Sequence, residues 1–219
     1  MYLFYYHTSC VFSRQIFILL QILDVKFSLV VSEYWCKNKD SKSYRKVPML
    51  ISKDIGVIDG VYPIFEYLLY LYPKNYLFPS DIKDLCELRR LMHFINYVFY
   101  YDVSNNFINQ KLISIYYSSG PPKIDLLKKA SNNLSYHLRY IMNLLKDRNF
   151  LLYDKISIID IVLACHISVI DYLGEINWHK YPILKNWYQI IKSIPQFRKI
   201  LSEKVALFSP PSYYDQVDF

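Results

Sequence analysis

Cys10 is the first side chain in the sequence whose type and setting suit chemistry. It stands with Ser13 in a Cys-x-x-Ser spacing, between the strand-like stretch YLFYY (2–6) and an apolar run with helical spacing. A thiol at the N-terminus of a helix has a lowered pKa and is a better nucleophile. Two interpretations therefore stay open at this point: a working thiol, or a small hydrophobic residue at a site that does no chemistry.

The cysteines favour a reducing compartment over a disulfide framework or a metal site. The sequence holds no CxxC pair and no Cys/His cluster with metal-ligand spacing, so we expect no metal and a cytoplasmic protein. The N-terminus lacks a basic region and a small-residue cleavage site, which argues against a signal peptide. No window of 18 uninterrupted apolar residues is present, so we expect no membrane span. The cysteines are Cys10, Cys36, Cys86 and Cys165.

The formal net charge is +7, and much of the excess lies in the segment CKNKDSKSYRK (36–46). Such a segment can steer acidic partners or nucleic acid, and it can equally be a solvated lysine-rich loop. The sequence shows no helix-turn-helix, zinc-finger or RNP pattern. We therefore expect no nucleic-acid partner.

The elements that must position Cys10 alternate between strand and helix over residues 1–73. Their order is β-α-β and then β-β-α, which is the order of a thioredoxin-like domain. The strand patterns cover residues 2–6, 25–31, 47–52 and 56–59, and the helix patterns cover 12–23 and 62–72.

After a proline-containing linker (74–80), residues 81–208 look wholly helical. One of these helices is apolar all round and should be central. A tail (209–219) follows, which we expect to be extended. The fold class is thus α/β plus all-α, an N-terminal thioredoxin-like domain followed by a helical domain. The expected helices cover residues 81–103, 124–147, 157–173, 181–194 and 195–205.

Two local signals sharpen this architecture. Val47-Pro48 precedes a strand, and an X-Pro bond in that place can be cis. Ser157 and Asp160 form a Ser-x-x-Asp capping box, in which two side chains satisfy the backbone amides at a helix start. We interpret this box as structural.

Together these segments resemble the glutathione S-transferase superfamily over essentially the whole chain. KVPMLI (46–51) resembles the family's Val-Pro segment, and VIDGVYPIFEYLLYLYP (57–73) resembles the element that follows it. SIIDIVLA (157–164) resembles the family's helix-capping box. The resemblance implies a thioredoxin-like domain joined to a transferase-type helical domain, a homodimer, and glutathione as the ligand to consider.

The resemblance also implies where glutathione would bind. The main chain of Val47, held by Pro48, would pair with the cysteinyl part, and Asp59 would pair with the γ-glutamyl ammonium. Gly60 stands where the family normally has Ser, so a hydroxyl for the γ-glutamyl carboxylate is missing. Losing one hydrogen bond to a charged group costs about 1.5–3 kcal/mol, or roughly one to two decades of affinity. Backbone amides at the helix start can still bind an anion.

For the sulfur-facing group, Cys10 resembles the cysteine of the omega and beta classes. Ser9 matches the theta-class serine with a slip of one residue. Val11 replaces the usual proline after the cysteine, and no second cysteine is close, so only a monothiol cycle is available.

The second half and the ending PPSYYDQVDF more narrowly resemble one alphaproteobacterial branch of the superfamily. That branch includes a dimeric protein that binds FtsZ filaments and is not known for transferase chemistry. Aromatic and charged side chains can form such a partner-binding surface. The candidates are Tyr34, Trp35, Arg89, Arg90, Asp215 and Asp218.

We therefore expect a non-catalytic, FtsZ-binding regulator of cell division. The alternative is a glutathione transferase or glutathione-dependent thiol transferase that uses Cys10. A third hypothesis is a partner of RNA polymerase that resembles the stringent starvation protein, which uses the same fold without chemistry.

Overall fold

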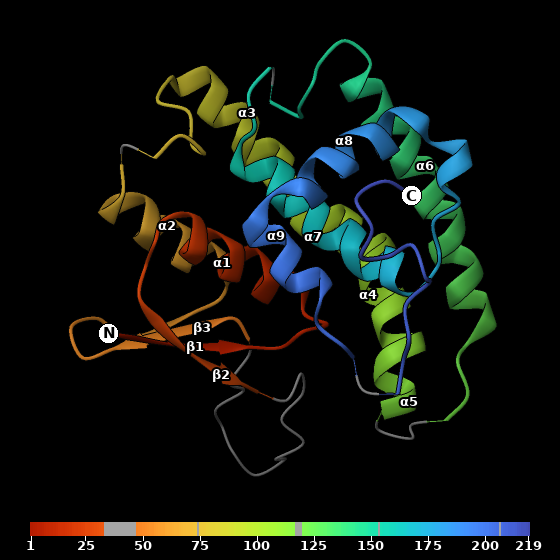
Figure 1. The fold of residues 1–219 in the computed structure, drawn as a ribbon, viewed down its shortest axis with the longest axis horizontal. Coiled ribbons are helices and arrows are strands. Elements are labelled where there is room, and N and C mark those ends of the chain that lie inside the picture. The colour runs from red at the N-terminus through yellow and green to blue at the C-terminus, as the bar shows by residue number, and fades with distance from the viewer. Residues whose placement is uncertain (33–46, 74, 117–119, 153, 206) are drawn as a thin grey trace. The chain divides into compact units, whose positions relative to one another are not determined.

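The computed structural model describes residues 1–32, 47–73, 75–116, 120–152, 154–205 and 207–219 (Figure 1). The chain forms two compact units, Met1–Tyr76 and Leu77–Phe219. The predictions for Tyr34 and Trp35, and for the basic segment 36–46, lie outside the described residues.

The first unit is built on a four-stranded sheet in the order β2-β1-β3-β4. Strand β1 runs parallel to β2 and antiparallel to β3, and β3 runs antiparallel to β4. This topology confirms the predicted thioredoxin-like domain. The elements are β1 (Tyr2–Tyr6), α1 (Val11–Ile22), β2 (Phe27–Val31), β3 (Met49–Ser52), β4 (Gly56–Asp59) and α2 (Val61–Leu71).

Aromatic rings and a nearly all-buried helix make the core of the first unit. Phe4 and Tyr6 alternate along β1 and are buried, as the period of two in a strand requires. The Tyr6 ring lies 5.2 Å from that of Phe17 on α1, and the Phe4 ring lies 5.9 Å from that of Phe27 on β2. This packing anchors the start of α1, where Cys10 lies, against the sheet.

The second unit is all helical, which confirms the predicted transferase-type C-terminal domain. Every residue of α7 is buried, so the helix that is apolar in sequence is the central one. The elements are α3 (Ile82–His93), η1 (Phe94–Ser104), α4 (Asn105–Phe107), η2 (Ile108–Ile113), α5 (Ser114–Tyr116), α6 (Ile124–Leu145), α7 (Ile158–Tyr172), η3 (Trp178–Lys180), α8 (Pro182–Ser193) and α9 (Pro195–Leu201).

The capping box predicted at the start of α7 is present. The backbone N–H and the hydroxyl of Ser157 both donate to Asp160 Oδ2, at 2.9 and 3.0 Å. Asp160 Oδ1 accepts two further hydrogen bonds, from the N–H of Leu151 at 2.9 Å and from Trp187 Nε1 at 3.0 Å. The box therefore also ties the preceding loop and α8 to α7.

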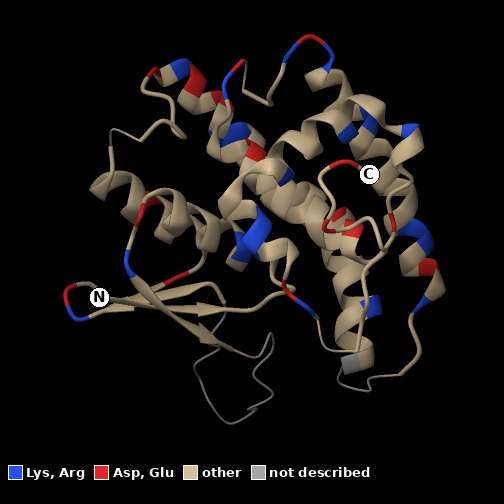
Figure 2. Cartoon of the chain, in the orientation of Figure 1, with Lys and Arg blue, Asp and Glu red and all other residues tan. Residues whose placement is uncertain are grey.

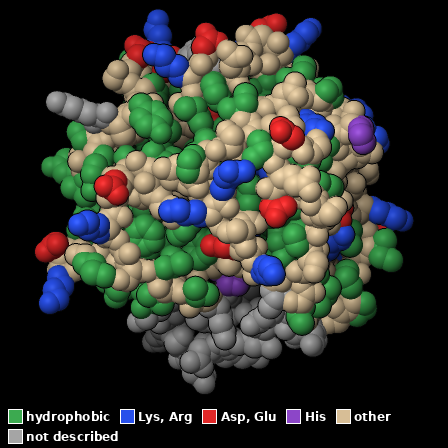
Figure 3. Space-filling view, in the orientation of Figure 1, with side chains coloured by type: hydrophobic (Ala, Val, Ile, Leu, Met, Phe, Trp, Pro, Cys, Tyr) green, Lys and Arg blue, Asp and Glu red, His purple; other side chains and the backbone are tan. Residues whose placement is uncertain are grey.

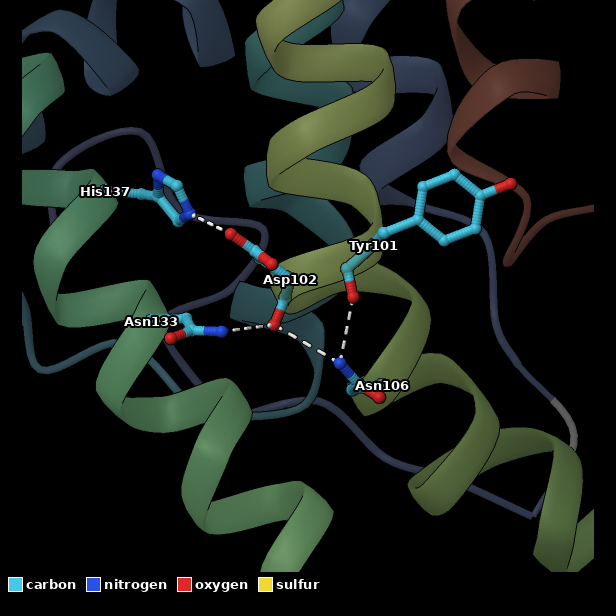
Figure 4. Close-up of polar contacts among 5 residues, drawn as sticks. All are labelled: Tyr101, Asp102, Asn106, Asn133 and His137. Atoms are coloured by element: carbon cyan, nitrogen blue, oxygen red, sulfur yellow. Dashed lines mark hydrogen bonds and ion pairs between the residues drawn. The ribbon is translucent and has the colours of Figure 1, made fainter.

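The first helical run of this unit is longer than predicted and is wound differently. It extends from residue 82 to residue 116 without a break, whereas the sequence pattern predicted an end at residue 103. The stretches η1 and η2 are π-helical, so each carbonyl accepts from the N–H five residues further along the chain instead of four. Asn106 Nδ2 donates to the carbonyls of Tyr101 and Asp102, at 3.0 and 3.2 Å (Figure 4).

Helix α6 is fastened to this π-helical run by two polar side chains. His137 Nε2 lies 2.9 Å from Asp102 Oδ2, and Asn133 Nδ2 donates to the Asp102 carbonyl at 3.3 Å (Figure 4). His137 is buried beside the rings of Phe94 and Phe99. A polar group in such an apolar place is costly unless it is hydrogen-bonded, so Asp102 stabilises the pair of helices.

Charges of both signs are spread over the described residues. Figure 2 shows lysines and arginines interspersed with aspartates and glutamates along the helices of the second unit. On the face drawn in Figure 3, hydrophobic side chains lie beside charged ones. Among the described residues on that face, lysines and arginines do not form one patch.

We predict that Asp102→Ala lowers the free energy of unfolding by about 1–3 kcal/mol, because it leaves buried His137 Nε2 without its partner. Urea denaturation followed by circular dichroism measures the change. The double variant Asp102→Ala/His137→Phe should recover part of the loss, since a phenyl ring suits the apolar surroundings of position 137. A double variant less stable than Asp102→Ala would contradict this explanation.

Candidate functional site

The turn between β1 and α1 positions Cys10 as the N-cap of α1. Its backbone is extended (φ −85°, ψ 110°), and its N–H donates to the His7 carbonyl at 3.0 Å. The Cys10 carbonyl accepts from the Arg14 N–H at 3.0 Å, which begins the helical ladder. The thiol is therefore placed at the positive end of the helix dipole, as the Cys-x-x-Ser spacing predicts.

The Cys10 thiol is enclosed by two backbone groups. Cys10 Sγ accepts from the Ser13 N–H at 3.4 Å, and the thiol donates to the Val47 carbonyl at 3.7 Å. The second contact needs the proton on sulfur. Only 2% of the residue is exposed.

Burial raises the pKa of the Cys10 thiol, and this effect exceeds the opposing one of the hydrogen bonds from Ser13 and the charge of Arg14. A helix start by itself lowers the pKa of a thiol. Here the cost of removing the thiolate from water is larger than the stabilisation that the helix end supplies, which favours the second of the two interpretations left open above. At neutral pH the group is a thiol.

Two residues beside Cys10 were not singled out from the sequence. Arg14 is buried, and its Nε donates to the Thr8 carbonyl at 2.6 Å. His7 Nδ1 accepts from the Ser9 N–H at 3.1 Å. Burial, and then the charge of Arg14, lower the pKa of His7 to about 4, so its imidazole is neutral at pH 7. The signal in the sequence that could have pointed to this pair is Arg14, a single arginine within an otherwise apolar helical pattern.

Ser9 lies in the same turn and is 3% exposed. Within the part of the chain that the structure describes, its hydroxyl has no hydrogen-bond partner. A buried hydroxyl without a partner is costly, and a polar group of a ligand could satisfy it. This hydroxyl is one feature of the turn that suits a bound molecule.

The residues predicted to hold glutathione by its backbone and its γ-glutamyl end lie together at the ends of β3 and β4. Met49 pairs with Asp59 in the antiparallel ladder, and the Gly60 N–H donates to the Pro48 carbonyl at 3.1 Å. The Val47–Pro48 bond is cis. Because the Val47 carbonyl also accepts the Cys10 thiol, the structure joins Cys10 to this group.

Gly60 is the N-cap of α2 and has a φ of +91°. A Cβ built on it would lie 3.7 Å from Pro63 Cδ, which is ordinary contact. The backbone conformation, rather than lack of space, is therefore what favours glycine, because L residues rarely adopt it. The helix start has no side-chain cap, so α2 presents backbone amides without the family's hydroxyl.

These residues fit glutathione only in part. The exposed carboxylate of Asp59 and the main chain of Val47 suit the ammonium and the peptide of the ligand. Against this, the Val47 carbonyl already accepts the Cys10 thiol, and that thiol is almost fully enclosed. The geometry supports binding of a peptide-like molecule better than it supports attack by sulfur.

The candidate partner-binding residues in the second unit lie on two separate elements. Arg89 and Arg90 are on α3, where Arg90 forms a bidentate ion pair with Glu87, at 2.7 Å for both contacts. That pairing lowers the pKa of Glu87. Asp215 and Asp218 are exposed on the tail, but Tyr214, directly before Asp215, is fully buried. The tail is therefore packed on its own unit.

The described residues include no cluster of three or more His, Cys, Asp or Glu side chains that could hold a metal ion. None of the helices in the described ranges combines the length and the apolar character that crossing a membrane requires.

Residues 105–204 match a family model described as glutathione S-transferase, C-terminal domain. The chain is 33% identical over 156 residues to FtsZ-localized protein A of Caulobacter vibrioides, covering 71% of this chain and 68% of that protein. A crystal structure of a glutathione S-transferase from Rhodospirillum rubrum F11 superposes with a TM-score of 0.93 at 31% identity over 100% of both chains. The structure of FzlA from C. crescentus superposes with a TM-score of 0.91 at 26% identity, covering 100% of this chain and 99% of that one.

We predict that Cys10 resists alkylation at neutral pH in the folded protein, whereas exposed Cys86 reacts. Iodoacetamide labelling at pH 7.5, followed by peptide mass spectrometry, should show Cys86 modified at least ~100-fold faster, because thiolate and access are both needed. In denaturant the two rates should converge. Comparable rates in the folded protein would show that the thiol is reactive after all.

Proposed function

We propose a function for this chain from the premise that it belongs to the glutathione S-transferase superfamily and has FtsZ-localized protein A among its relatives. The proposal is that the chain is a non-catalytic member that binds FtsZ filaments and regulates cell division. The observation that carries it is the combination of that relationship with a Cys10 that is enclosed and protonated.

The state of Cys10 supports a binding role over a catalytic one. Transferase and thiol-transfer chemistry both need a sulfur that a substrate can reach, and the nucleophile is the thiolate. Here the thiol donates to Val47 and is buried, so its contacts stabilise the β1–α1 turn. Because Cys10 serves in packing, we propose that other surfaces of the chain carry its function.

The residues proposed to contact a partner are charged and aromatic side chains. The net charge of +7 favours approach to an acidic partner at low ionic strength. We propose that the chain acts as a homodimer in the cytoplasm, which would give a filament two equivalent contacts. The residues proposed to bind are Tyr34, Trp35, Arg89, Arg90, Asp215 and Asp218.

We predict that the protein sediments with polymerised FtsZ of its own organism and stays in the supernatant without polymer. Trp35→Ala and Arg89→Glu should each reduce the pelleted fraction at least ~5-fold, since anchor residues dominate an interface. Lys199→Glu, at an exposed position of α9, makes a matched change of charge and should leave pelleting unchanged. Pelleting no higher than that of an unrelated protein would rule out the proposal.

The second candidate function is glutathione-dependent thiol transfer, and the Ser9 hydroxyl without a partner favours it. In that reaction the Cys10 thiolate attacks the glutathionyl sulfur of a mixed disulfide, so an S–S bond to Cys10 forms and the protein thiolate leaves. A glutathione thiolate then attacks that bond, which releases glutathione disulfide and restores the Cys10 thiolate. The cycle needs Cys10 to lose both its proton and its contact with Val47.

Calorimetric titration with glutathione separates the two functions. We predict a Kd in the millimolar range or weaker, because Gly60 supplies no hydroxyl to the γ-glutamyl carboxylate. Asp59→Asn should abolish any remaining heat, while Cys10→Ala should leave it unchanged if the sulfur has no role. A Kd in the micromolar range that weakens in Cys10→Ala would restore the enzyme function.

A further inference from the structure

The ring of Phe219, at the end of the tail, lies in a socket made by aromatic and cationic side chains of the second unit. Its centroid is 5.1 Å from that of Trp178 on η3 and 6.2 Å from that of Tyr188 on α8. Two lysines of α8 lie over the ring, with Nζ of Lys192 at 4.0 Å and Nζ of Lys185 at 5.0 Å from its centroid. Contacts of this kind between a cation and a ring face are attractive.

Other residues of the tail complete the enclosure. The Tyr213 ring stacks on Phe219 at 5.5 Å, and the Tyr214 ring meets Tyr172 of α7 edge-on at 5.1 Å. Figure 1 shows the C-terminal end lying alongside α8. The tail therefore covers a site that α7, η3 and α8 build.

Two charged side chains lie under this cover. Lys192 is fully buried, and Asp171 of α7 accepts from Trp178 Nε1 at 2.8 Å. Burial lowers the pKa of Lys192 to about 8 and raises that of Asp171 to about 6. Burial disfavours the charged form of each group, while the charge of Asp215 on the tail favours the charged form of Lys192.

The tail is joined to the helices mainly by rings and charge. Residues 207–219 contain no helix or strand, and the hydrogen bonds from Tyr214 N–H to Pro211 O (3.0 Å) and from Gln216 N–H to Tyr213 O (3.1 Å) lie within the tail. Directly before the tail, the Phe208 carbonyl accepts from the Tyr172 hydroxyl of α7 at 2.9 Å, which fixes the start of the segment. The bond from Lys192 Nζ to the Tyr213 carbonyl is 3.5 Å long, the outer limit for such a contact. A segment held in this way can open without unfolding the helices.

We propose that residues 209–219 are a reversible strap over an aromatic–cationic socket, and that the open socket binds peptide segments in which an aromatic ring is followed or preceded by carboxylates. The strap itself indicates the chemistry of the ligand. It places the Phe219 ring under the two lysines, and the negative charge of Asp215 favours the charged form of Lys192. Acidic aromatic peptides then compete with the strap for one site. The proposal does not depend on FtsZ as the partner.

The experiment uses the full chain and a fluorescein-labelled peptide of the sequence SPPSYYDQVDF (209–219). Fluorescence anisotropy should show Phe219→Ala binding this peptide at least ~10-fold more tightly than the unchanged protein, because the competing strap is weakened. Val217→Ala truncates an apolar side chain of the same tail and should bind like the unchanged protein. The same peptide with alanine at its last position should not bind.

Hydrogen exchange of the unchanged protein supplies a second measurement that needs no variant. Excess peptide should accelerate exchange of the amides in residues 212–219 at least ~5-fold while leaving those of α7 unaffected, because the peptide displaces the strap and not the helix. Failure of every form of the protein to bind the peptide would overturn the proposal. So would tail amides that exchange only with the slowest amides of α7, whether or not peptide is added.

Discussion

The second unit depends on one buried carboxylate, that of Asp160. It accepts hydrogen bonds from the N–H and the hydroxyl of Ser157, the N–H of Leu151 and the indole of Trp187. Burial raises its pKa, and these four donors compensate for the lost water. Because the donors come from the loop before α7, from the start of α7 and from α8, their shared acceptor sets where three segments meet. The tail socket, built on α7, η3 and α8, inherits its geometry from that junction.

The Cys10 thiol follows the same physical rule, because burial raises its pKa as well. Asp160 has four donors, whereas Cys10 Sγ accepts from the Ser13 N–H and gives its own proton to the Val47 carbonyl. Because the sulfur has few donors and is fully buried, Cys10 is a neutral thiol at pH 7. A sulfur at a helix start can thus serve either as a nucleophile or as a small buried donor, and solvent access decides between them. In this chain the contacts of Cys10 join the β1–α1 turn to the segment that precedes β3.

Local patterns in the sequence were sufficient for most of the fold and for part of the candidate site. The capping box at Ser157 was predictable because a Ser-x-x-Asp spacing acts within one helical turn, and the order of strands and helices along the chain followed from the hydrophobic patterns. The protonation state of Cys10 was not, since it depends on burial and on a carbonyl 37 residues away. The role of Phe219 was equally hidden: ring contacts with α8 and η3 are tertiary, and no spacing in the tail encodes them. The π-helical winding near Asp102 depends on partners on another helix.

The left-handed backbone at Gly60 bears on how this lineage can evolve. A hydroxyl cannot be regained there by one codon change at no cost, because a side chain would first need the turn to relax to a negative φ. A variant with a side chain at position 60 would therefore be less stable before the new hydroxyl could contact a ligand. The conformation of this turn therefore opposes the gain of a hydroxyl at this position.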